Sequence, residues 1–553
     1  MKKVVIIGGV AGGATAAARL RRLDEKAEII MFEKEEYISI ANCGLPYYIG
    51  GTITDKNELT VQTPASFNAR FNIDVRNFSE VLSINAKDKN VLVYNKKEDR
   101  KYTESYDSLI ISTGAKPVIP SLDGIDNKKV FTLRNIPDTY KIKNYITENN
   151  LKSACIIGGG YIGIEMAENL KHLGLDVSIV EMSDQIIAPI DYDMASTVHT
   201  YIEENGINLM LNTKLLSIKD EDIGVTINLS ENREIKADIV ILSIGIRPDT
   251  SLAKNASIAL NDRGYIITDN KMQTSIKDIY AVGDAIEVTE FVTKTKATIA
   301  LAVPANKEGR VVSDVIDSEN YAKEGYTGTQ GSSILKIFNM TVASTGVNEK
   351  TAKRLNLNYD KVFTYSPSHA TYYPGATNMT IKTIFEKQTG RILGAQIVGG
   401  EGVDKRCDVL ATAIRFNGTA NDLVNLELCY APPFSSAKDP VNIVGYVIQN
   451  LLENKVKNFH WHDVAELINR KDITLLDVRT KYEFSRGHLD NFINIPLDDI
   501  RARIDELPKS KPIYLTCHIG HRGYLASRIL TQNGYEVFNL NGGYRLYKTI
   551  IKD

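Results

Sequence analysis

Two cysteines stand far from any partner cysteine and in different chemical settings. Cys43 lies in the segment Ser-Ile-Ala-Asn-Cys-Gly-Leu-Pro-Tyr-Tyr, and the next cysteine along the chain is Cys155. A disulfide at Cys43 must therefore form with something other than a neighbouring cysteine. Cys517 lies in a short loop near the C-terminus that contains glycine and arginine. Because the thiolate is the reactive form of cysteine, two isolated thiols suggest that sulfur moves between sites.

A strand–turn–helix–strand pattern precedes Cys43 and predicts a dinucleotide-binding fold. The strand at residues 4–7 runs into a glycine-rich turn and then into a helix that extends to Leu23. Glu33 closes the next strand about 20 residues after the turn, where a carboxylate can bind ribose hydroxyls. Val10 occupies the place of the second fingerprint glycine, so this copy alone is only moderately specific. The glycines expected to admit a pyrophosphate are Gly8, Gly12 and Gly13.

The pattern recurs in complete form. A strand at residues 154–157 leads into a full Gly-x-Gly-x-x-Gly turn and a helix, and the following strand ends in Glu181. These parts in register make the motif far more specific than the glycines alone. Two such folds predict two dinucleotides, FAD and a nicotinamide. The glycines of this second turn are Gly158, Gly160 and Gly163.

The nicotinamide preference is indicated by the residues after Glu181. They are Met-Ser-Asp-Gln, with no arginine to bind a 2′-phosphate, which favours NADH and leaves NADPH possible. Two other segments fit FAD: a strand that runs into Thr113 and Gly114, and a strand followed by Gly283 and Asp284. Asp284 is expected to bind a ribitol hydroxyl, although a helix N-cap is an alternative that is compatible with this role.

Composition limits the other function classes. A length of 553 residues predicts three to four domains, and 43% apolar residues suffice for real cores. The net charge of −2 argues against nucleic acid and anionic membrane partners. The apolar run at residues 4–7 is too short for a signal or membrane segment. Five scattered cysteines without Cys-x-x-Cys fit the cytoplasm and predict no structural metal site.

The reductase part resembles a known family. Residues 1–450 resemble the single-cysteine branch of the pyridine nucleotide-disulfide oxidoreductases, and the Ser-x-x-Asn-Cys-Gly-x-Pro segment around Cys43 resembles that of the coenzyme A-disulfide reductases. Such enzymes reduce coenzyme A disulfide with FAD and a nicotinamide. The resemblance implies that Cys43 is the redox cysteine and that the chain is a homodimer.

The C-terminal part resembles a rhodanese domain. The similarity rests on Asp-Val-Arg at residues 477–479, Arg-Gly-His-Leu at 486–489 and the loop at 517–522. Residues 491–492 are Asn-Phe where rhodaneses usually have Gly-Ala, which is expected to alter packing and not chemistry. The fusion resembles coenzyme A-disulfide reductase–rhodanese proteins, some of which reduce coenzyme A persulfide or polysulfide.

These resemblances imply an α/β fold with two Rossmann-like dinucleotide-binding domains, an α+β dimerisation domain and a C-terminal α/β rhodanese domain. The expected boundaries are 1–150 and 271–327 for the two parts of the FAD domain, 151–270 for the NAD(P)H domain, 328–450 for the dimerisation domain, 451–457 for a linker and 458–553 for the rhodanese domain.

The resemblance also implies coenzyme A contacts. Thr15, Arg19 and Arg22 lie on one face of the first helix, where a solvated basic face is the ordinary interpretation. In the resembled reductases these positions meet the phosphates of coenzyme A, a partner that suits arginine. Further positions that match coenzyme A contacts are Ser39, Asn42 and Lys438.

Two tyrosines match a pair that reaches the partner subunit's active site in these reductases. They are Tyr430 and Tyr372, with Tyr373 as a close competitor of Tyr372. Without the resemblance, core or interface packing is the ordinary expectation for both.

The remaining cysteines are expected to pack as small buried hydrophobes, as free cysteine often does. They are Cys155, Cys407 and Cys429. Cys517 differs, because it ends a strand and starts a tight loop before a helix expected near Tyr524. Such a loop directs backbone N–H groups at one point and stabilises an anion. Cys517 and Arg522 form a Cys-x4-Arg loop that suits a persulfide, whereas His518 and His521 are not expected to act as general bases.

Two alternative functions are also compatible with parts of the sequence. One is an NADH oxidase or peroxidase that cycles Cys43 through sulfenic acid. Relatives of that type have a histidine at the position of Val10, and valine transfers no protons. The other is a sulfur-carrying or redox-sensing protein without reductase activity, against which the two dinucleotide folds argue.

Overall fold

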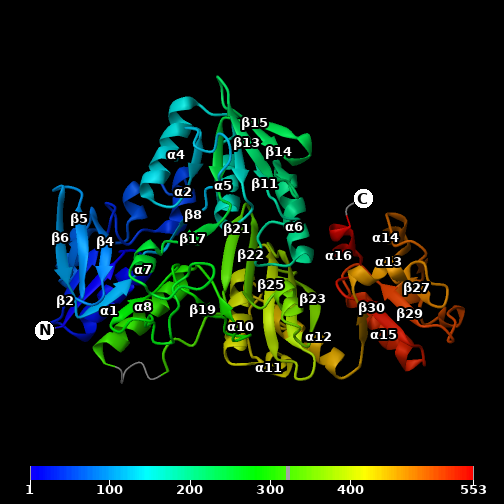
Figure 1. Ribbon diagram of the computed structural model, residues 1–553. Coiled ribbons are helices and arrows are strands. Elements are labelled where there is room, and N and C mark those ends of the chain that lie inside the picture. The colour runs from blue at the N-terminus through cyan, green and yellow to red at the C-terminus, as the bar shows by residue number, and fades with distance from the viewer. Residues whose placement is uncertain (1, 319–323, 552–553) are drawn as a thin grey trace. The chain divides into compact units, whose positions relative to one another are not determined.

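The computed structural model describes residues 2–318 and 324–551 (Figure 1). It divides into two compact units. The first consists of Met1–Ile186 and Gly206–Gly331, and the second consists of Ile187–Asn205 and Ser332–Asp553. The short segment Ile187–Asn205 therefore folds with the second unit, although its neighbours in sequence belong to the first.

The first unit contains the two predicted dinucleotide folds, each with a five-stranded parallel sheet. The sheet nearer the N-terminus has the order β18 (Ile279–Ala281), β7 (Ser108–Ile111), β1 (Lys3–Ile7), β2 (Glu28–Phe32) and β3 (Asp74–Arg76). The other sheet has the order β12 (Ile207–Met210), β11 (Asp176–Val180), β10 (Ser153–Ile157), β16 (Ile239–Leu242) and β9 (Val130–Thr132).

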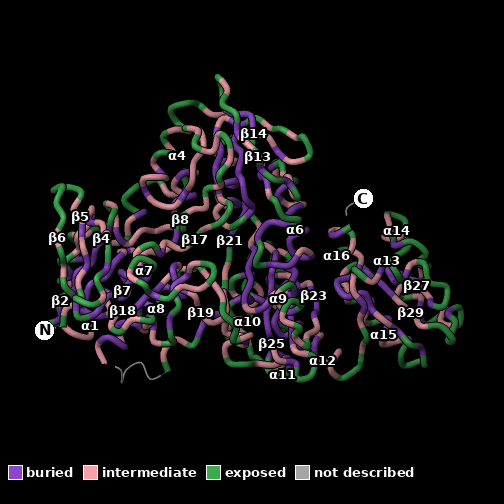
Figure 2. Tube along the Cα trace, viewed as in Figure 1, coloured by how far each residue is buried: buried purple, intermediate pink, exposed green. Residues whose placement is uncertain are grey.

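The inner strands β1, β7, β10 and β16 are apolar because both faces of each sheet are covered there. In β1, Val4, Val5 and Ile6 have no exposed surface. The buried strands β7 and β18 of the first sheet are purple in Figure 2. The helices of this unit are α1 (Ala11–Leu23), α2 (Leu45–Ile49), α3 (Pro64–Phe71), α4 (Ile136–Asn149), α5 (Tyr161–His172), α7 (Ser251–Asn255) and α8 (Ala302–Asp317).

Smaller antiparallel elements complete the first unit. They are the meanders β4 (Ser79–Asn85), β5 (Asn90–Asn95), β6 (Arg100–Ser105) and β13 (Leu215–Asp220), β14 (Val225–Leu229), β15 (Glu234–Ala237), with the pairs β8 (Ala115–Pro117), β17 (Ile246–Pro248) and β19 (Val288–Thr289), β20 (Lys296–Ala297).

The second unit contains the predicted antiparallel sheet. Its order is β21 (Ser333–Ile337), β22 (Met340–Gly346), β25 (Ile392–Gly399), β24 (Asn378–Glu386) and β23 (Tyr359–Pro367), so β23 is an edge strand. The helices that accompany it are α6 (Tyr192–Glu204), α9 (Glu349–Arg354), α10 (Val403–Arg415), α11 (Ala420–Asn425) and α12 (Pro440–Leu452).

The C-terminal part of the second unit is a parallel α/β fold. Its sheet has the order β26 (Lys457–Phe459), β30 (Val537–Leu540), β29 (Ile513–Thr516), β27 (Thr474–Asp477) and β28 (Ile493–Asn494). The helices are α13 (Val464–Leu467), α14 (Lys481–Ser485), α15 (His521–Gln532) and α16 (Gly543–Ile550). Helix α15 begins at His521 and not near Tyr524, because Gly520 has a positive φ of 92° that ends the loop immediately before it.

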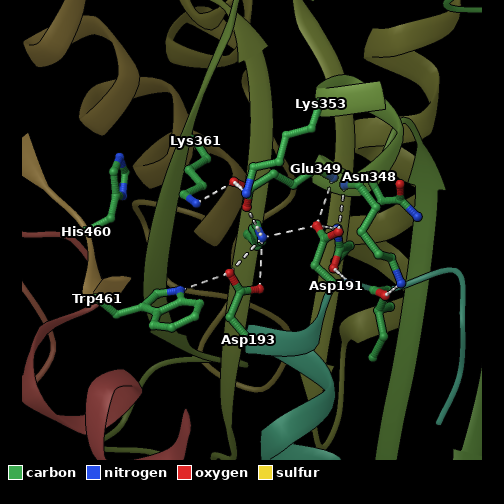
Figure 3. A network of polar contacts seen from close by, with 12 residues as sticks. Asp191, Asp193, Asn348, Glu349, Lys353, Lys361, His460 and Trp461 are labelled. Carbon is green, nitrogen blue, oxygen red and sulfur yellow. Dashed lines mark hydrogen bonds and ion pairs between the residues drawn. The ribbon is translucent and has the colours of Figure 1, made fainter. Parts of the chain in front are cut away.

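A buried network of charges holds α6 against the antiparallel sheet (Figure 3). Lys382 of β24 has no exposed surface, and its Nζ lies 2.8 Å from carboxylate oxygens of Asp193 and Glu349 and 3.0 Å from Asp191. Lys361 of β23 adds a second ion pair of 2.6 Å to Glu349. Buried charges are stable only when they are paired in this way.

The C-terminal part is attached to the same region. Trp461 Nε1 donates to Asp193 at 3.4 Å. Asn541 lies beside the edge strand β23 and binds its backbone twice: it accepts from the Phe363 N–H at 3.0 Å and donates to the Lys361 carbonyl at 2.8 Å. One amide side chain thus satisfies edge groups that otherwise have no strand partner.

Candidate active site with two dinucleotide turns and two thiols

The first turn requires glycine at Gly8 and Gly13 for steric reasons. Gly8 has a φ of +99°, and a Cβ there would lie 2.2 Å from the Ser112 carbonyl oxygen. A Cβ on Gly13 would lie 1.9 Å from the Gly8 oxygen. Helix α1 starts after Val10 without a side-chain cap. Its first N–H groups therefore meet no capping side chain, which suits a pyrophosphate.

Glu33 ends β2 as the sequence predicts. Its carboxylate accepts from the N–H groups of Gly9 at 3.0 Å and Glu35 at 3.2 Å. Burial raises the pKa of this carboxyl group, although the two N–H donors oppose that effect. The turn thus holds the carboxylate beside the helix N-terminus.

A cavity of about 540 Å³ lies over this turn. Asn42, the neighbour of Cys43, lines it, and its Oδ1 is buried with no hydrogen-bond partner among the described residues. An unpaired buried acceptor fits a ligand donor. The cavity brings together most of the predicted FAD residues, namely Gly8, Gly12, Glu33, Thr113, Gly114 and Asp284.

Asp284 does not cap a helix, so the N-cap alternative is wrong. The next helix, α8, begins only at Ala302, because the chain after Asp284 forms turns and short strands. The Asp284 carboxylate instead pairs with Arg134 at 3.1 Å. Arg134 also lines the cavity and was not predicted, since no motif marks it. The residues present therefore fit a bound dinucleotide such as FAD.

The second turn repeats this geometry. Gly158 has a φ of +106°, and a Cβ there would lie 2.5 Å from the Ser243 oxygen. Glu181 accepts from the N–H groups of Gly159 at 2.7 Å and Ser183 at 2.8 Å. A Cβ at Gly160 would meet nothing within 4 Å, so there is room above the turn. The residues fit a second dinucleotide.

Cys43 lies in a single helical turn, Asn42–Gly44, and is exposed. Partial burial of the thiol raises its pKa, and the negative charges of Glu165 and Asp284 raise it further. The chain's own residues in the first unit thus oppose the thiolate. Ser39, four residues earlier, has a strained φ of +50°.

Glu165 is a functional candidate that the sequence did not reveal. It lies on α5 immediately after the second glycine turn, and burial with the nearby Glu168 raises its pKa to about 7. Tyr47 hydrogen-bonds to it, and burial raises the pKa of Tyr47 to about 12. A carboxyl group with a pKa near 7 beside an exposed cysteine is typical of active sites.

The predicted coenzyme A face of α1 is only partly a solvated basic face. Arg19 pairs with Asp314 of α8 at 2.8 Å, and the Thr15 hydroxyl donates to Asn306 at 2.7 Å. Arg22 is exposed and has no carboxylate partner among the described residues. Its charge is therefore available to an anion, whereas Arg19 already shares its charge with a carboxylate.

Tyr372 and Tyr430 are brought together in the second unit. Their hydroxyls lie 2.8 Å apart, and the side chains are 74% and 49% exposed. The Tyr430 hydroxyl raises the pKa of Tyr372 through this hydrogen bond. Tyr373 instead packs edge-on against His369. Both predicted tyrosines are therefore on the surface of this unit and not in its core.

The three remaining cysteines differ in burial. Cys155 and Cys407 are buried, as expected. Cys429 is exposed, so its predicted burial is wrong. Cys429 lies in the segment that connects α11 and α12, and Tyr430 and Phe434 of the same segment are also exposed. Lys438, from the same stretch, is exposed.

Cys517 follows β29 in the expected anion-binding loop. Its sulfur accepts from the Gly520 N–H at 3.1 Å. Burial raises the pKa of the thiol, while the N–H groups of Gly523, Ile519 and Gly520 lower it. The loop thus supplies converging donors that Cys43 lacks.

Arg522 is fixed by a bidentate ion pair. Its two terminal nitrogens lie 2.7 Å and 2.6 Å from the oxygens of Glu483. The hydrogen bond from Arg522 lowers the pKa of Glu483 to about 2. His518 and His521 are both exposed.

No group of three His, Cys, Asp or Glu residues that could hold a metal ion occurs within residues 2–318 and 324–551. Over the same ranges, no helix has the length and apolar character needed to cross a membrane.

Comparison with known proteins identifies three regions. Residues 2–309 match the pyridine nucleotide-disulphide oxidoreductases, residues 332–440 match the dimerisation domain of that family, and residues 460–549 match the rhodanese-like domain. The chain is 37% identical over 452 residues to a coenzyme A disulfide reductase of Staphylococcus haemolyticus, which covers 82% of this chain and 100% of the relative.

Two solved structures are similar over nearly the whole chain. Reduced Bacillus anthracis CoADR-RHD has a TM-score of 0.97 and 49% identity, covering 99% of this chain and 98% of that one. The NAD-dependent persulfide reductase from A. fulgidus has a TM-score of 0.91 and 37% identity, covering 99% and 100%. The chain therefore belongs to the pyridine nucleotide-disulphide oxidoreductase family and is an FAD- and nicotinamide-dependent oxidoreductase with a C-terminal rhodanese domain.

Proposed function

We propose that the chain uses NAD(P)H to reduce coenzyme A disulfide, coenzyme A persulfide or polysulfide at Cys43, while Cys517 handles sulfane sulfur. The observation that carries this proposal is the position of Cys43. It is an exposed thiol without a cysteine partner, and its neighbour Asn42 lines the dinucleotide cavity. A disulfide formed at Cys43 with a small molecule would therefore lie beside the source of electrons.

The chemistry at Cys43 follows from thiol exchange. Its thiolate attacks one sulfur of the disulfide, a new Cys43 mixed disulfide forms, and one coenzyme A thiolate leaves. When bound, FAD and the nicotinamide supply two electrons as a hydride equivalent. Two-electron reduction of the mixed disulfide returns the Cys43 thiolate and releases the second coenzyme A thiol.

Coenzyme A recognition is assigned to the residues that the family resemblance implies. The phosphates meet Thr15, Arg19 and Arg22, of which Arg22 has no carboxylate partner among the described residues. Ser39, Asn42 and Lys438 are further proposed contacts. A homodimer formed through the domain at residues 332–440 brings Tyr372 and Tyr430 to the partner's active site, where a phenol stabilises the leaving thiolate. We place this chemistry in the cytoplasm, where free thiols persist.

Steady-state kinetics with coenzyme A disulfide, coenzyme A persulfide and polysulfide test the proposal. Cys43→Ser is expected to abolish all three reductions and to leave FAD reduction by NADH intact, because hydride transfer does not pass through sulfur. Full activity of this variant overturns the central claim. The same assays with NADH and NADPH test the expected NADH preference, which a tenfold higher kcat/KM for NADPH contradicts.

Oxygen and peroxide serve as control acceptors in these assays. NADH consumption with either as sole acceptor, at rates matching those with coenzyme A disulfide, indicates the oxidase or peroxidase function instead. Absence of FAD reduction by NADH indicates a sulfur carrier without reductase activity.

A further inference from the structure

The loop of Cys517 borders a cavity that the reductase and rhodanese parts of the chain line together. A cavity of about 570 Å³ in the second unit is lined by Ile519, Gly520 and His521 of this loop. Residues 363–367 of the edge strand β23 and residues of α12 line it from the reductase part, and further rhodanese residues, including Tyr524 and Asn541, complete its walls. Cys517 itself has no exposed surface, and the N–H that binds its sulfur belongs to Gly520.

Tyr365 of β23 lies in this wall. The Arg545 guanidinium lies 5.4 Å from the centre of its ring. Arg545 is held by the sulfur-transfer loop, because its N–H donates to the His518 carbonyl at 2.9 Å and the N–H of Tyr544 donates to the Cys517 carbonyl at 2.8 Å. The loop thus holds the arginine that packs on the Tyr365 ring.

The Tyr365 hydroxyl is an available donor. No side chain among the described residues hydrogen-bonds it. Burial raises its pKa, the charge of Arg545 opposes this, and negative charges on Asp193 and Cys517 raise the pKa further, so the phenol keeps its proton at neutral pH. The neighbouring Thr364 Oγ1, also in the cavity wall, is buried and unpaired among the described residues. Unpaired polar groups in a cavity wall indicate a ligand.

We propose that Tyr365, supplied by the reductase part, is a substrate-contacting residue of the sulfur-transfer site and donates a hydrogen bond to the terminal sulfur of a Cys517 persulfide. This inference rests on the proposed sulfur transfer at Cys517. With thiosulfate, the Cys517 thiolate attacks the sulfane sulfur, an S–S bond to Cys517 forms, the S–S bond of thiosulfate breaks, and sulfite leaves with the electron pair. The added sulfur carries the negative charge that the phenol stabilises.

The test uses the full-length holoenzyme and the variants Tyr365→Phe and Tyr446→Phe. Phenylalanine keeps the ring on which Arg545 packs and removes only the hydroxyl. Tyr446 lines the same cavity from α12 and has no ring contact with Arg545 among the described residues, so it is the matched control. The protein is incubated with thiosulfate, and formation and decay of the Cys517 persulfide are followed by mass spectrometry.

Tyr365→Phe is expected to form the persulfide about tenfold more slowly and to lose it about tenfold faster, as befits one hydrogen bond to an anion. Tyr446→Phe is expected to match the wild type, and both variants to retain NADH-dependent reduction of coenzyme A disulfide. A Tyr365→Phe persulfide as long-lived as the wild type overturns the inference alone, and so does an equal loss in both variants. A wild-type enzyme that forms no persulfide at Cys517 overturns both this inference and the proposed sulfur transfer.

Discussion

Cys43, the proposed redox cysteine, is surrounded by protein groups that oppose its thiolate form. Partial burial and the charges of Glu165 and Asp284 all raise its pKa. Burial also raises the pKa of Cys517, but there three backbone N–H donors oppose that effect. Activation of Cys43 must therefore come from groups that bind beside it, whereas the loop around Cys517 carries its own stabilisation.

Replacing Glu165 should remove one of the negative charges that raise the pKa of Cys43. Because the pKa of Glu165 is about 7, its charge is present above neutral pH and is lost below it. Glu165→Gln should therefore lower the pKa of Cys43 and speed its alkylation by iodoacetamide at pH 8 a few-fold, less than the tenfold of a full pKa unit. At pH 6 the variant and wild type should converge. Peptide mass spectrometry separates Cys43 from the exposed Cys429.

The control for this experiment is Glu25→Gln, which removes an exposed carboxylate just beyond the C-terminal end of α1. It should alkylate like the wild type at both pH values. Equal rates for Glu165→Gln and wild type at pH 8 contradict the assigned charge effect.

Among the elements, α6, β23 and β24 meet at the Lys382 network (Figure 3). Burial alone raises the pKa of Glu349 and Asp191, but the charge of Lys382 outweighs it and holds both below their usual range. One cation thus neutralises carboxylates from α6 and from α9. The arrangement is stable only while that cation is present.

Lys382→Met should destabilise the second unit by about 3–5 kcal/mol, the typical cost of leaving buried charges unpaired. In the wild type, the ion pairs of Lys382 with Asp191 and Glu349 stabilise the fold above the unfolded-state pKa of these carboxylates. This stabilisation is lost as the pH falls through their lowered folded-state pKa values. The cost of the substitution should therefore be largest near pH 7 and shrink toward pH 5, where the unpaired carboxyl groups take up protons. Urea unfolding followed by fluorescence measures it, because Trp461 is the only tryptophan and binds Asp193.

Lys353 offers a matched control, since it also pairs with Glu349, at 3.0 Å, but is 63% exposed. Lys353→Met should cost less than about 1 kcal/mol. Similar costs for the two substitutions would mean that burial does not decide the strength of this network.

Elements with local signals could be predicted from the sequence. The two glycine turns and their acids are set by steric limits within about 25 residues, and Gly8 and Gly158 lie where expected. The Lys382 network could not be predicted, because it depends on the register of β23 with β24 and on the folding of Ile187–Asn205 with the second unit. Tyr365 has no motif either, since only docking of the C-terminal part beside an edge strand gives it a role.

At the scale of the whole molecule, the two thiols belong to different units. Cys43 lies in the first unit with both dinucleotide folds, and Cys517 lies in the second. The C-terminal part is joined to α12 through residues 453–456 only and is fixed by Asn541 and Trp461. Extended residues span at most about 3.6 Å each, so the connection gives the C-terminal part little freedom to swing.

This separation predicts that the two activities can be removed independently. Each thiol has its own surroundings for its elementary step, and neither step requires the other sulfur. Cys517→Ser should keep NADH-dependent reduction of coenzyme A disulfide and lose sulfur transfer from thiosulfate. Cys43→Ser should lose the reduction and still acquire a persulfide at Cys517. Paired assays of both activities in both variants decide the matter: an equal loss of both activities in either variant shows that the thiols are obligately coupled, and sulfur must then pass between Cys517 and Cys43 in every cycle.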